Sequence, residues 1–406
     1  MNRPTVLFYC QHSLGLGHLV RSFALAGALA ERFRVVLLNG GRLPRGLPVP
    51  PGVEVISLPP LGMSVDGTLV SHDRRRSTDR ALYLRRERML ALHAELRPDV
   101  LFVELFPFGR KKFAGELVPL LEAARDAGTL TVCSLRDILV ASRHDQRTFD
   151  ERASVRANAL LDAILVHSDP RFARLEESFD PVTPLAVPVH YTGFVLPGGD
   201  RDKAQALAPT PPVSARPRVV VSAGGGAYGG ALMAAAIEAH RLELADAGVD
   251  VRIIAGPFLP EAEWQLLRAA AQGRPGLEVR RAVPDLVAEL RTAAASVSQC
   301  GYNTTLDLLR TGVPALVVPF SEGGEDEQTR RAERLERVGA VRVLEAGRAD
   351  GAGLAAAIRE LLAFRPEPVE LDLDGARKTA LAVGNLLARR AAPAPDPSRP
   401  LVAVTR

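Results

Sequence analysis

This sequence contains few of the residues that mark a disulfide-bonded, metal-binding or membrane-spanning protein. Its 406 residues include only three cysteines, Cys10, Cys133 and Cys300, which lie far apart along the chain. An odd number of widely spaced cysteines fits a reducing compartment and gives no metal-ligand spacing. No apolar run approaches the ~20 residues needed to cross a bilayer, and the N-terminus has no secretory signal pattern. We therefore expect a cytoplasmic protein without a bound metal.

Lysine is almost absent, and arginine carries the basic charge. The only lysines are Lys111, Lys112, Lys203 and Lys378, and the formal net charge is +4. The densest basic stretch, residues 74–88, overlaps a segment in which Leu82, Met89 and Leu96 recur at seven-residue spacing, which predicts a helix with one apolar stripe and a basic face. A solvated helix face is the simplest interpretation, with an anionic acceptor or an acidic membrane surface as the alternative. We expect no nucleic-acid partner.

Short apolar runs alternate with amphipathic segments in the first half of the chain. We expect strands at residues 5–10, 34–38, 53–58, 100–104, 130–135 and 163–167, and helices at 21–32, 77–96, 113–127 and 148–161. This alternation predicts a doubly wound parallel sheet with helices on both faces.

The alternation begins again after a polar stretch rich in proline and glycine. Further strands are expected at residues 218–221, 251–255, 277–280, 295–299, 315–318 and 340–344. We therefore predict a first Rossmann-like domain at 1–198, a linker at 199–215, a second at 216–370, a closing helix at 371–390 and a disordered tail at 391–406. Because open parallel sheets bind ligands at the carboxyl ends of their strands, the function is expected on the loops that follow strands, in a cleft between the two domains.

The loop after the first expected strand contains Gly15, Gly17 and His18 directly before a helix. One interpretation is a dinucleotide-binding turn, and another is a catalytic histidine at a helix start that favours phosphate. His12 lies nearer the strand end and is a second candidate, with a structural role as its simpler explanation.

A second glycine-rich turn, Gly224, Gly225 and Gly226, follows the first strand of the second domain. Adjacent glycines let the backbone approach a ligand, and amides at a helix start favour an anion such as a diphosphate. The turn lacks the Gly-Lys-Ser/Thr of a phosphate-binding P-loop and the GxGxxG dinucleotide spacing. A tight turn without a ligand is the alternative.

The stretch from Ser298 to about residue 340 carries the most specific pattern. Gly301 follows a strand, and a helix then begins with the oxygen-bearing side chains Asn303, Thr304 and Thr305, which suit a phosphate. One turn later Asp307 could bond a ribose diol. After the next strand, Glu327 and Gln328 could bond sugar hydroxyls. Each residue alone could also be a helix cap or a solvated polar group.

This ordered block resembles the donor-site signature of the GT-B glycosyltransferases. It is most similar to the family 28-like group that contains the N-acetylglucosaminyl transferase of the lipid-linked peptidoglycan precursor. The resemblance implies a nucleoside-diphosphate sugar donor, UDP- or dTDP-linked, as co-substrate, and no other cofactor. It implies that Gly17, Gly224, Gly225, Gly226, Val283, Gly301, Asn303, Thr304, Thr305, Asp307, Glu327 and Gln328 bind this donor.

The same resemblance assigns the acceptor side to the first domain. His18 would take the proton of an acceptor hydroxyl, with Glu104 or Asp137 to orient it. Phe108, Arg110 and Arg136 would line the acceptor, which could be lipid-linked, a glycan or a small molecule, and peripheral membrane contact is a further expectation. Transfer without a metal and with inversion of the anomeric centre is implied by the family.

Three alternatives remain at this point. The stretch GLGHLVR also resembles the UDP-sugar hydrolase of pseudaminic acid synthesis, in which the histidine serves a water. A nucleotide-sugar 2-epimerase and a non-catalytic GT-B partner subunit are the others. The aspartate at 307 is shorter than the family's usual glutamate, and Glu327 stands where a glutamine or aspartate is common, so the donor sugar stays open.

Overall fold

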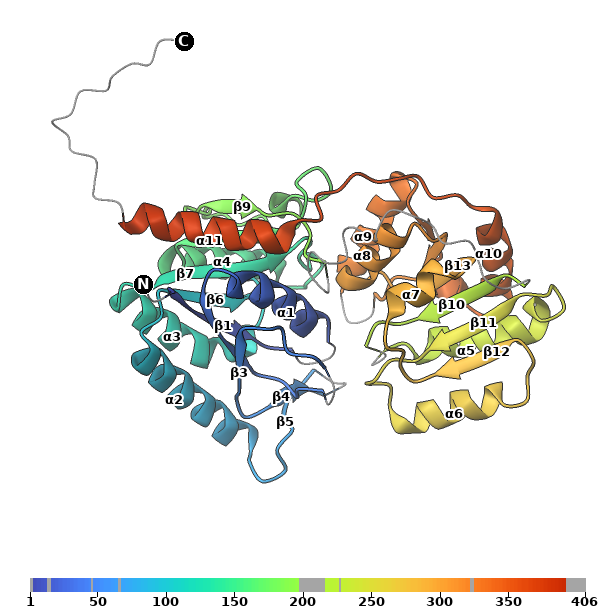
Figure 1. The fold of residues 1–406 in the computed structure, drawn as a ribbon, viewed down its shortest axis with the longest axis horizontal. Helices are drawn as coiled ribbons and strands as arrows, with labels where there is room; N and C mark the ends of the chain where they lie inside the picture. The colour runs from blue at the N-terminus through green and yellow to red at the C-terminus, as the bar shows by residue number, and fades with distance from the viewer. Residues whose placement is uncertain are drawn as a thin grey trace, which may run out of the picture.

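The computed structural model describes residues 3–12, 16–44, 47–64, 67–196, 216–225, 228–321 and 325–391. Within them the chain folds into two parallel sheets, each covered by helices, that lie side by side (Figure 1). This confirms the predicted α/β class with two doubly wound units. The predicted linker lies outside the described residues, as does the predicted tail beyond Ala391.

The N-terminal half contains a seven-stranded sheet in the order β3-β2-β1-β6-β7-β8-β9, in which all neighbours are parallel. Its strands are β1 (Thr5–Cys10), β2 (Arg34–Asn39), β3 (Val53–Ser57), β6 (Val100–Glu104), β7 (Leu130–Arg136), β8 (Ala163–His167) and β9 (Val189–Tyr191). The helices of this half are α1 (Gly17–Ala30), α2 (Thr78–Leu96), α3 (Ala114–Asp126) and α4 (Gln146–Leu160). A short antiparallel hairpin, β4 (Leu61–Met63) and β5 (Leu69–Ser71), stands apart from the sheet.

The C-terminal half contains a six-stranded parallel sheet in the order β12-β11-β10-β13-β14-β15. Its strands are β10 (Arg218–Ser222), β11 (Asp250–Ile254), β12 (Leu277–Arg280), β13 (Ala295–Ser298), β14 (Ala315–Val317) and β15 (Arg342–Val343). The helices are α5 (Gly230–Ala239), α6 (Glu261–Ala271), α7 (Leu286–Arg291), α8 (Tyr302–Thr311), α9 (Glu327–Arg337) and α10 (Gly351–Ala363).

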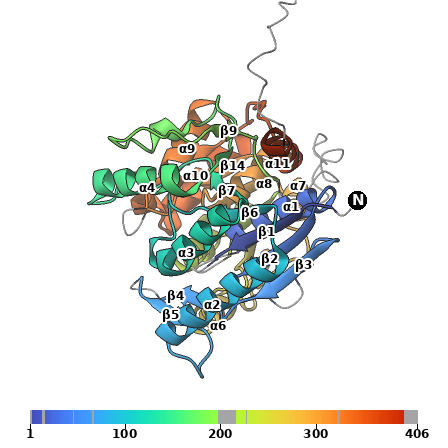
Figure 2. The same cartoon turned by 90° about the vertical axis from the view of Figure 1, so that its left-hand side faces the viewer.

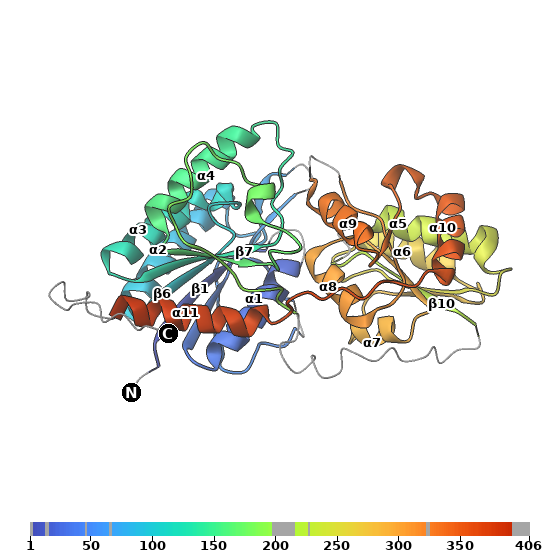
Figure 3. The ribbon, with the colours of Figure 1, turned by 90° about the horizontal axis from the view of Figure 1, so that it is seen from above.

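The chain returns to the N-terminal half in its last helix, α11 (Gly375–Ala391). This helix packs along α1, as the view from above shows (Figure 3). Val383 of α11 is fully buried in the same apolar cluster as Phe23 of α1. The turned view shows α2 and α3 on the other side of this sheet (Figure 2).

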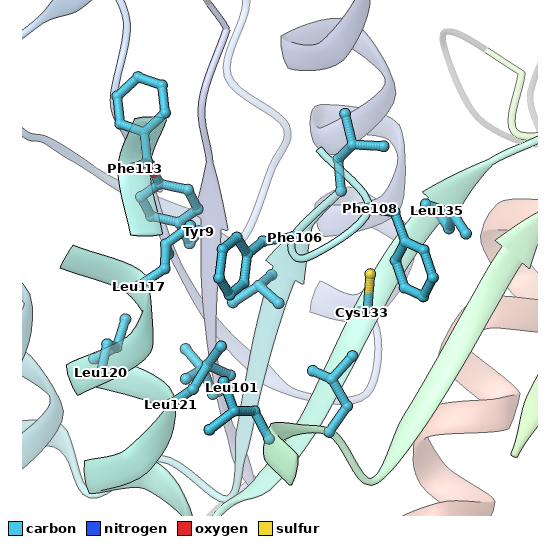
Figure 4. Close-up of a cluster of buried hydrophobic side chains, with 14 of the residues drawn as sticks. Tyr9, Leu101, Phe106, Phe108, Phe113, Leu117, Leu120, Leu121, Cys133 and Leu135 are labelled. Atoms are coloured by element: carbon cyan, nitrogen blue, oxygen red, sulfur yellow. The ribbon is translucent and has the colours of Figure 1, made fainter. Parts of the chain in front are cut away.

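The first sheet is buried on both faces, as its continuous apolar runs require. Alternate residues of β1 point to opposite faces, so that Leu7 and Tyr9 join the core under α2 and α3 while Val6 and Phe8 join the core under α1 and α11. Figure 4 shows Tyr9, Leu101 of β6 and Leu117 of α3 in the first of these cores. Among the described helices, none is long and apolar enough to cross a membrane.

The predicted strands recur within two residues of their expected ends, whereas three features were not predicted. These are the β4–β5 hairpin, the edge strand β9, and the burial of Arg85 on α2. The prediction of a basic helix face is wrong for Arg85, which is fully buried and ion-paired with Glu116 at 2.7 Å. Helical spacing alone does not show that Glu116 of α3 lies opposite Arg85 and neutralises it.

Candidate functional site

The proposed base, His18, is the second residue of α1, directly beyond the carboxyl end of β1. Its Nδ1 lies 2.5 Å from Oε1 of Glu104, the last residue of β6. The two residues meet because β1 and β6 are neighbours in the sheet, so their carboxyl ends lie side by side. The side chain of His18 is 21% exposed, whereas that of Glu104 is fully buried.

Two arginines hold the Glu104 carboxylate in place. Nη2 of Arg21, one turn along α1, donates to Oε1 at 2.5 Å and lies 3.2 Å from Nδ1 of His18. Nη2 of Arg110 donates to the other oxygen, Oε2, at 3.0 Å. Charge-assisted bonds of this kind make Glu104 a fixed acceptor for the ring N–H of His18.

These contacts set the protonation of the pair. Burial alone would raise the pKa of Glu104, but the hydrogen bond from His18 and the charges of Arg110 and Arg21 hold it well below its usual range. Burial is the main cause that lowers the pKa of His18 to about 3, and Arg110 and Arg21 act in the same direction against the opposing effect of Glu104. His18 is therefore neutral near pH 7, with Nδ1–H donated to Glu104 and Nε2 left as the basic nitrogen.

The loop after β6 is strained where it presents its arginine. Leu105 and Arg110 have φ values of 67° and 59°, in the left-handed region that non-glycine residues seldom adopt. Such strain is concentrated at functional sites, because the surrounding structure must impose it. Here it turns Arg110 back toward Glu104.

The predicted donor residues of the C-terminal half gather at the start of α8. Gly301 is the residue before the helix, and Thr304 lies in its first turn. Gly224, at φ 53°, comes close to the same side chain, since a Cβ on either glycine would lie about 4 Å from Thr304 Oγ1 (3.9 Å for Gly224 and 4.0 Å for Gly301). The glycine turn after β10 and the start of α8 thus form one surface. Gly225 belongs to this turn, whereas Gly226, like Gly15, lies outside the described residues.

The remaining donor-side residues are placed around this surface. Thr305 is buried with Oγ1 3.5 Å from Cys300 Sγ, and Asp307 forms an ion pair with Arg310 at 2.9 Å. Val283 is half-buried in the loop before α7. Gln328 Oε1 accepts the backbone N–H of Cys300 at 2.9 Å, which ties the start of α9 to the end of β13.

The first turns of α1 and α8 touch, which brings the two halves of the site together. Nδ2 of Asn303 donates to the carbonyl oxygen of Gly17 at 3.1 Å. The ring of Tyr302 lies under the guanidinium of Arg21, 5.2 Å from ring centroid to Cζ. His18, the candidate base, and the start of α8, the predicted phosphate site, therefore lie next to each other.

Asp137 does not orient His18, which corrects the sequence prediction. Its carboxylate forms a bidentate ion pair with Arg331 of α9, at 2.7 and 2.8 Å. Arg331 also bonds Glu327 at 2.7 Å, and Glu327 in turn is ion-paired with Arg136. These four buried or nearly buried side chains join β7 and the loop after it to α9, so both oxygens of Glu327 are engaged by arginine.

Two other predicted side chains lie inside the protein. Phe108, expected at the acceptor surface, is 1% exposed and packs edge-to-face on Phe179 with ring centroids 5.0 Å apart, so that prediction is corrected (Figure 4). His12 is also buried, which is the main cause that lowers its pKa to about 4. Within the described part of the chain, no group of three or more acidic, histidine or cysteine side chains could hold a metal.

Sequence reasoning missed Arg21, Tyr302 and Arg331, which connect the site residues to one another. Arg21 and Tyr302 stand inside the two motifs that predict the site, but the sequence pattern gives neither of them a role. Arg331 follows Glu327 by one helical turn, an i, i+4 spacing that favours an ion pair. No local signal indicates that its other partner, Asp137, comes from the first half.

Comparison with known protein families identifies the class of the C-terminal half. Residues 221–380 match the model of the glycosyltransferase family 28 C-terminal domain. The C-terminal half therefore carries a domain of this family, and the predicted relationship is confirmed for this part of the chain.

Individual relatives point the same way. A 98-residue segment is 36% identical to the UDP-N-acetylglucosamine–N-acetylmuramyl-(pentapeptide) pyrophosphoryl-undecaprenol N-acetylglucosamine transferase of Pseudomonas paraeruginosa. This match covers 24% of the chain and 27% of that enzyme, so the chain is matched over about a quarter of the relative's length.

Solved structures extend the likeness to the whole fold. The calicheamicin glycosyltransferase CalG4 superposes with a TM-score of 0.57 at 18% identity, over 96% of this chain and 95% of that one. Phytolacca americana UGT2, complexed with UDP-2-fluoro-glucose and pterostilbene, gives 0.58 at 16% identity, over 96% and 94%. The fold is that of the GT-B glycosyltransferases, as predicted.

Proposed function

We propose that this protein transfers a sugar from a nucleoside-diphosphate sugar to an acceptor hydroxyl, with His18 as the general base. The observation that carries this proposal is the contact between the two helix starts. Asn303, at the predicted diphosphate site, lies 3.1 Å from Gly17, the residue before His18. A leaving diphosphate and a base on the attacking hydroxyl must lie close together, on either side of the anomeric carbon.

The state of His18 suits this role. A neutral imidazole whose Nδ1–H is bound to Glu104 has a lone pair on Nε2 for the proton of a hydroxyl. As that proton arrives, the ring becomes cationic, and the adjacent Glu104 carboxylate stabilises it. The hydroxyl oxygen then attacks the anomeric carbon, and the bond to the diphosphate breaks.

The donor would bind across the glycine turn and α8. Amide groups at Gly224, Gly301 and the first turn of α8 would receive the diphosphate, whose negative charge the helix start favours. Asp307 would bond the ribose, and the loop at Val283 would border the base. Gln328, whose carbonyl oxygen is taken by the backbone, would offer its amide N–H groups to the donor sugar. Glu327 supports this segment through its arginines.

The acceptor side has an excess of positive charge. Two guanidinium groups, Arg21 and Arg110, face the single carboxylate of Glu104. Arg110 is also 14% exposed, so it is within reach of a ligand. An anionic group on the acceptor would neutralise this excess positive charge, and we propose that Arg110 contacts that group.

A thermal-shift screen tests the donor site. UDP, dTDP, GDP, ADP and UDP-N-acetylglucosamine are compared, and a ligand at a hundredfold excess over its Kd stabilises the native state by about 2.7 kcal/mol. We expect one diphosphate to raise the Tm of the native protein and not that of Asp307→Asn. Asp350→Asn, the same substitution at the N-cap of helix α10, where the amide oxygen can still accept the N–H of Gly353, is the matched control and keeps the shift.

The product identifies the reaction. Sugar joined to an acceptor supports the transferase, whereas free sugar formed from the donor without an acceptor would support the hydrolase. No Tm shift with any nucleotide would overturn the nucleotide-sugar proposal. Binding without either product would indicate the non-catalytic partner subunit.

A further inference from the structure

Tyr302 belongs to the donor-side helix by sequence, yet its side chain lies in the other half of the molecule. The residue is 6% exposed, and burial raises the pKa of its hydroxyl, which therefore remains a donor. It donates to the carbonyl oxygen of His167 at 3.0 Å and accepts the backbone N–H of Val195 at 2.9 Å. His167 is the last residue of β8 and Val195 follows β9, so the hydroxyl fixes the start of α8 onto the N-terminal half.

The ring of the same residue supports the environment of His18. Arg21 lies 5.2 Å above the ring centroid, a distance typical of a cation–π contact. Arg21 is 2% exposed, and its Nη2 lies 2.5 Å from Glu104 Oε1 and 3.2 Å from His18 Nδ1. A displacement of Arg21 would therefore change the surroundings of His18, the proposed base, directly.

We propose that Tyr302 is a positioning residue, which holds Arg21 against Glu104 and so sets the orientation and basicity of His18 only when α8 is docked on α1. The docking of α8, which carries the predicted donor residues, and the orientation of His18 are thus coupled through the side chain of Tyr302. The expected effect of Tyr302 on kcat rests on the proposed function. The expected effect of Tyr302 on the orientation and pKa of His18 does not.

The groups around His18 determine in which direction its pKa changes when the Tyr302 ring is lost. They are Glu104 on β6, Arg110 on the loop after it, Arg21 on α1 itself, the Cys10 thiol on β1 and the uncharged residues of α8. Loss of the Tyr302 ring frees Arg21 and admits water. Both changes favour the imidazolium, so the pKa of His18 rises toward its ordinary value.

Nuclear magnetic resonance of the full-length protein tests this coupling without any substrate. Long-range ¹H–¹⁵N correlations report the tautomer and protonation of His18, whose signals are identified by their loss in His18→Gln. The titration extends to acid, and we expect the native protein to show neutral His18 with Nδ1–H from pH 7.5 down to about pH 4. In Tyr302→Leu the pKa of His18 rises by about one unit or more, and Tyr302→Phe, which keeps the ring, shows a smaller rise.

Tyr191→Phe is the matched control. Its hydroxyl also accepts a backbone N–H, that of Leu175 at 2.8 Å, and has no contact with α1. His18 should be unchanged in this variant. Unchanged His18 signals in both Tyr302 variants would overturn the proposal, and Tyr302→Phe decides the matter if Tyr302→Leu does not fold.

Kinetics then separate the coupling from the proposed function. With a transferred sugar as product, Tyr302→Leu should lower kcat by on the order of tenfold, with little change in donor KM. The acid limb of kcat/KM should move upward with the pKa measured by resonance. A fixed acid limb despite a shifted His18 pKa would show that His18 is not the base, which would overturn the proposed role of His18 while the structural coupling stands.

Discussion

The chemistry of His18 depends on the balance of charge around its partner, Glu104. Glu104 is the one carboxylate between two buried or nearly buried arginines and a histidine. In the proposed mechanism it keeps His18 in a single tautomer and stabilises the positive charge that His18 gains. Removal of one member of a buried ion pair is costly, because the partner stays behind without its counter-charge.

Glu104→Gln should therefore lower kcat by about 10²-fold or more, since the amide neither fixes the Nδ1–H tautomer firmly nor stabilises the imidazolium. The free energy of unfolding should fall by about 3–5 kcal/mol, because Arg21 and Arg110 lose their carboxylate. Steady-state kinetics and urea unfolding measure the two effects.

Glu116→Gln is the matched control for this change. Glu116 is equally buried and paired with an arginine, but it does not touch His18. Its loss of stability should be similar, whereas kcat stays within a few-fold of the native value. Equal losses of kcat in the two variants would mean that Glu104 acts through stability alone.

The elements of the first sheet show how a charged residue can join a core. Helix α2 is capped by Ser77, whose side chain accepts the N–H of Arg80 at 3.2 Å. Two turns further along, Arg85 donates to Glu116 of α3 and to the carbonyl oxygens of Gly40 and Pro59. One side chain thus ties α2 to α3 and to the loops that follow β2 and β3.

Arg85→Met should lower the free energy of unfolding by about 3–5 kcal/mol, because it leaves Glu116 buried without its cation. Arg86→Met, at the next and exposed position, should change it by no more than about 0.5 kcal/mol. Urea unfolding of both variants measures this difference. Equal small effects would contradict the burial of Arg85.

At the scale of the whole molecule, the two halves meet through buried polar groups. The Asp137–Arg331 ion pair and the Tyr302–His167 hydrogen bond both cross this junction. His167 is itself fully buried between Ser134 and Thr192, at 2.7 and 2.9 Å, and burial is the main cause that lowers its pKa to about 3. His18 lies at the same junction with a similarly low pKa.

Acid should therefore weaken the fold well above the pH at which carboxylates titrate. In the unfolded chain these histidines bind protons near pH 6.5, whereas in the native protein His12, His18 and His167 stay neutral to about pH 4, 3 and 3. Stability is thus full above pH 6.5 and falls as the pH decreases, by about 1.4 kcal/mol per pH unit for each histidine.

Urea unfolding at pH 7, 6 and 5 measures this slope. His167→Gln should reduce it by about one proton, and the exposed His144→Gln should leave it unchanged. A slope that does not differ between these two variants would show that His167 is protonated in the native state.

The local pattern of the sequence predicted most of the fold. Strand-length apolar runs, such as Thr5–Cys10, are buried on both faces in the structure, and a helix begins directly after Gly301, with the oxygen-bearing residues 303–305 in its first turn. Such features depend on neighbours in the chain, so periodicity and turn chemistry reveal them. The β4–β5 hairpin and β9 have only three residues per strand, too few for a clear period.

The partners of the site residues were decided by tertiary structure. The sequence offered Glu104 and Asp137 equally as partners of His18, because Glu104 ends one strand and Asp137 follows another. The order of the sheet separates them, since β6 is adjacent to β1 whereas β7 lies one strand further away. Asp137 is instead taken by Arg331, a residue 194 positions later that no local pattern connects to it. The sequence by itself determined the elements and the residues at their ends, and the packing of the sheets determined which of those residues meet.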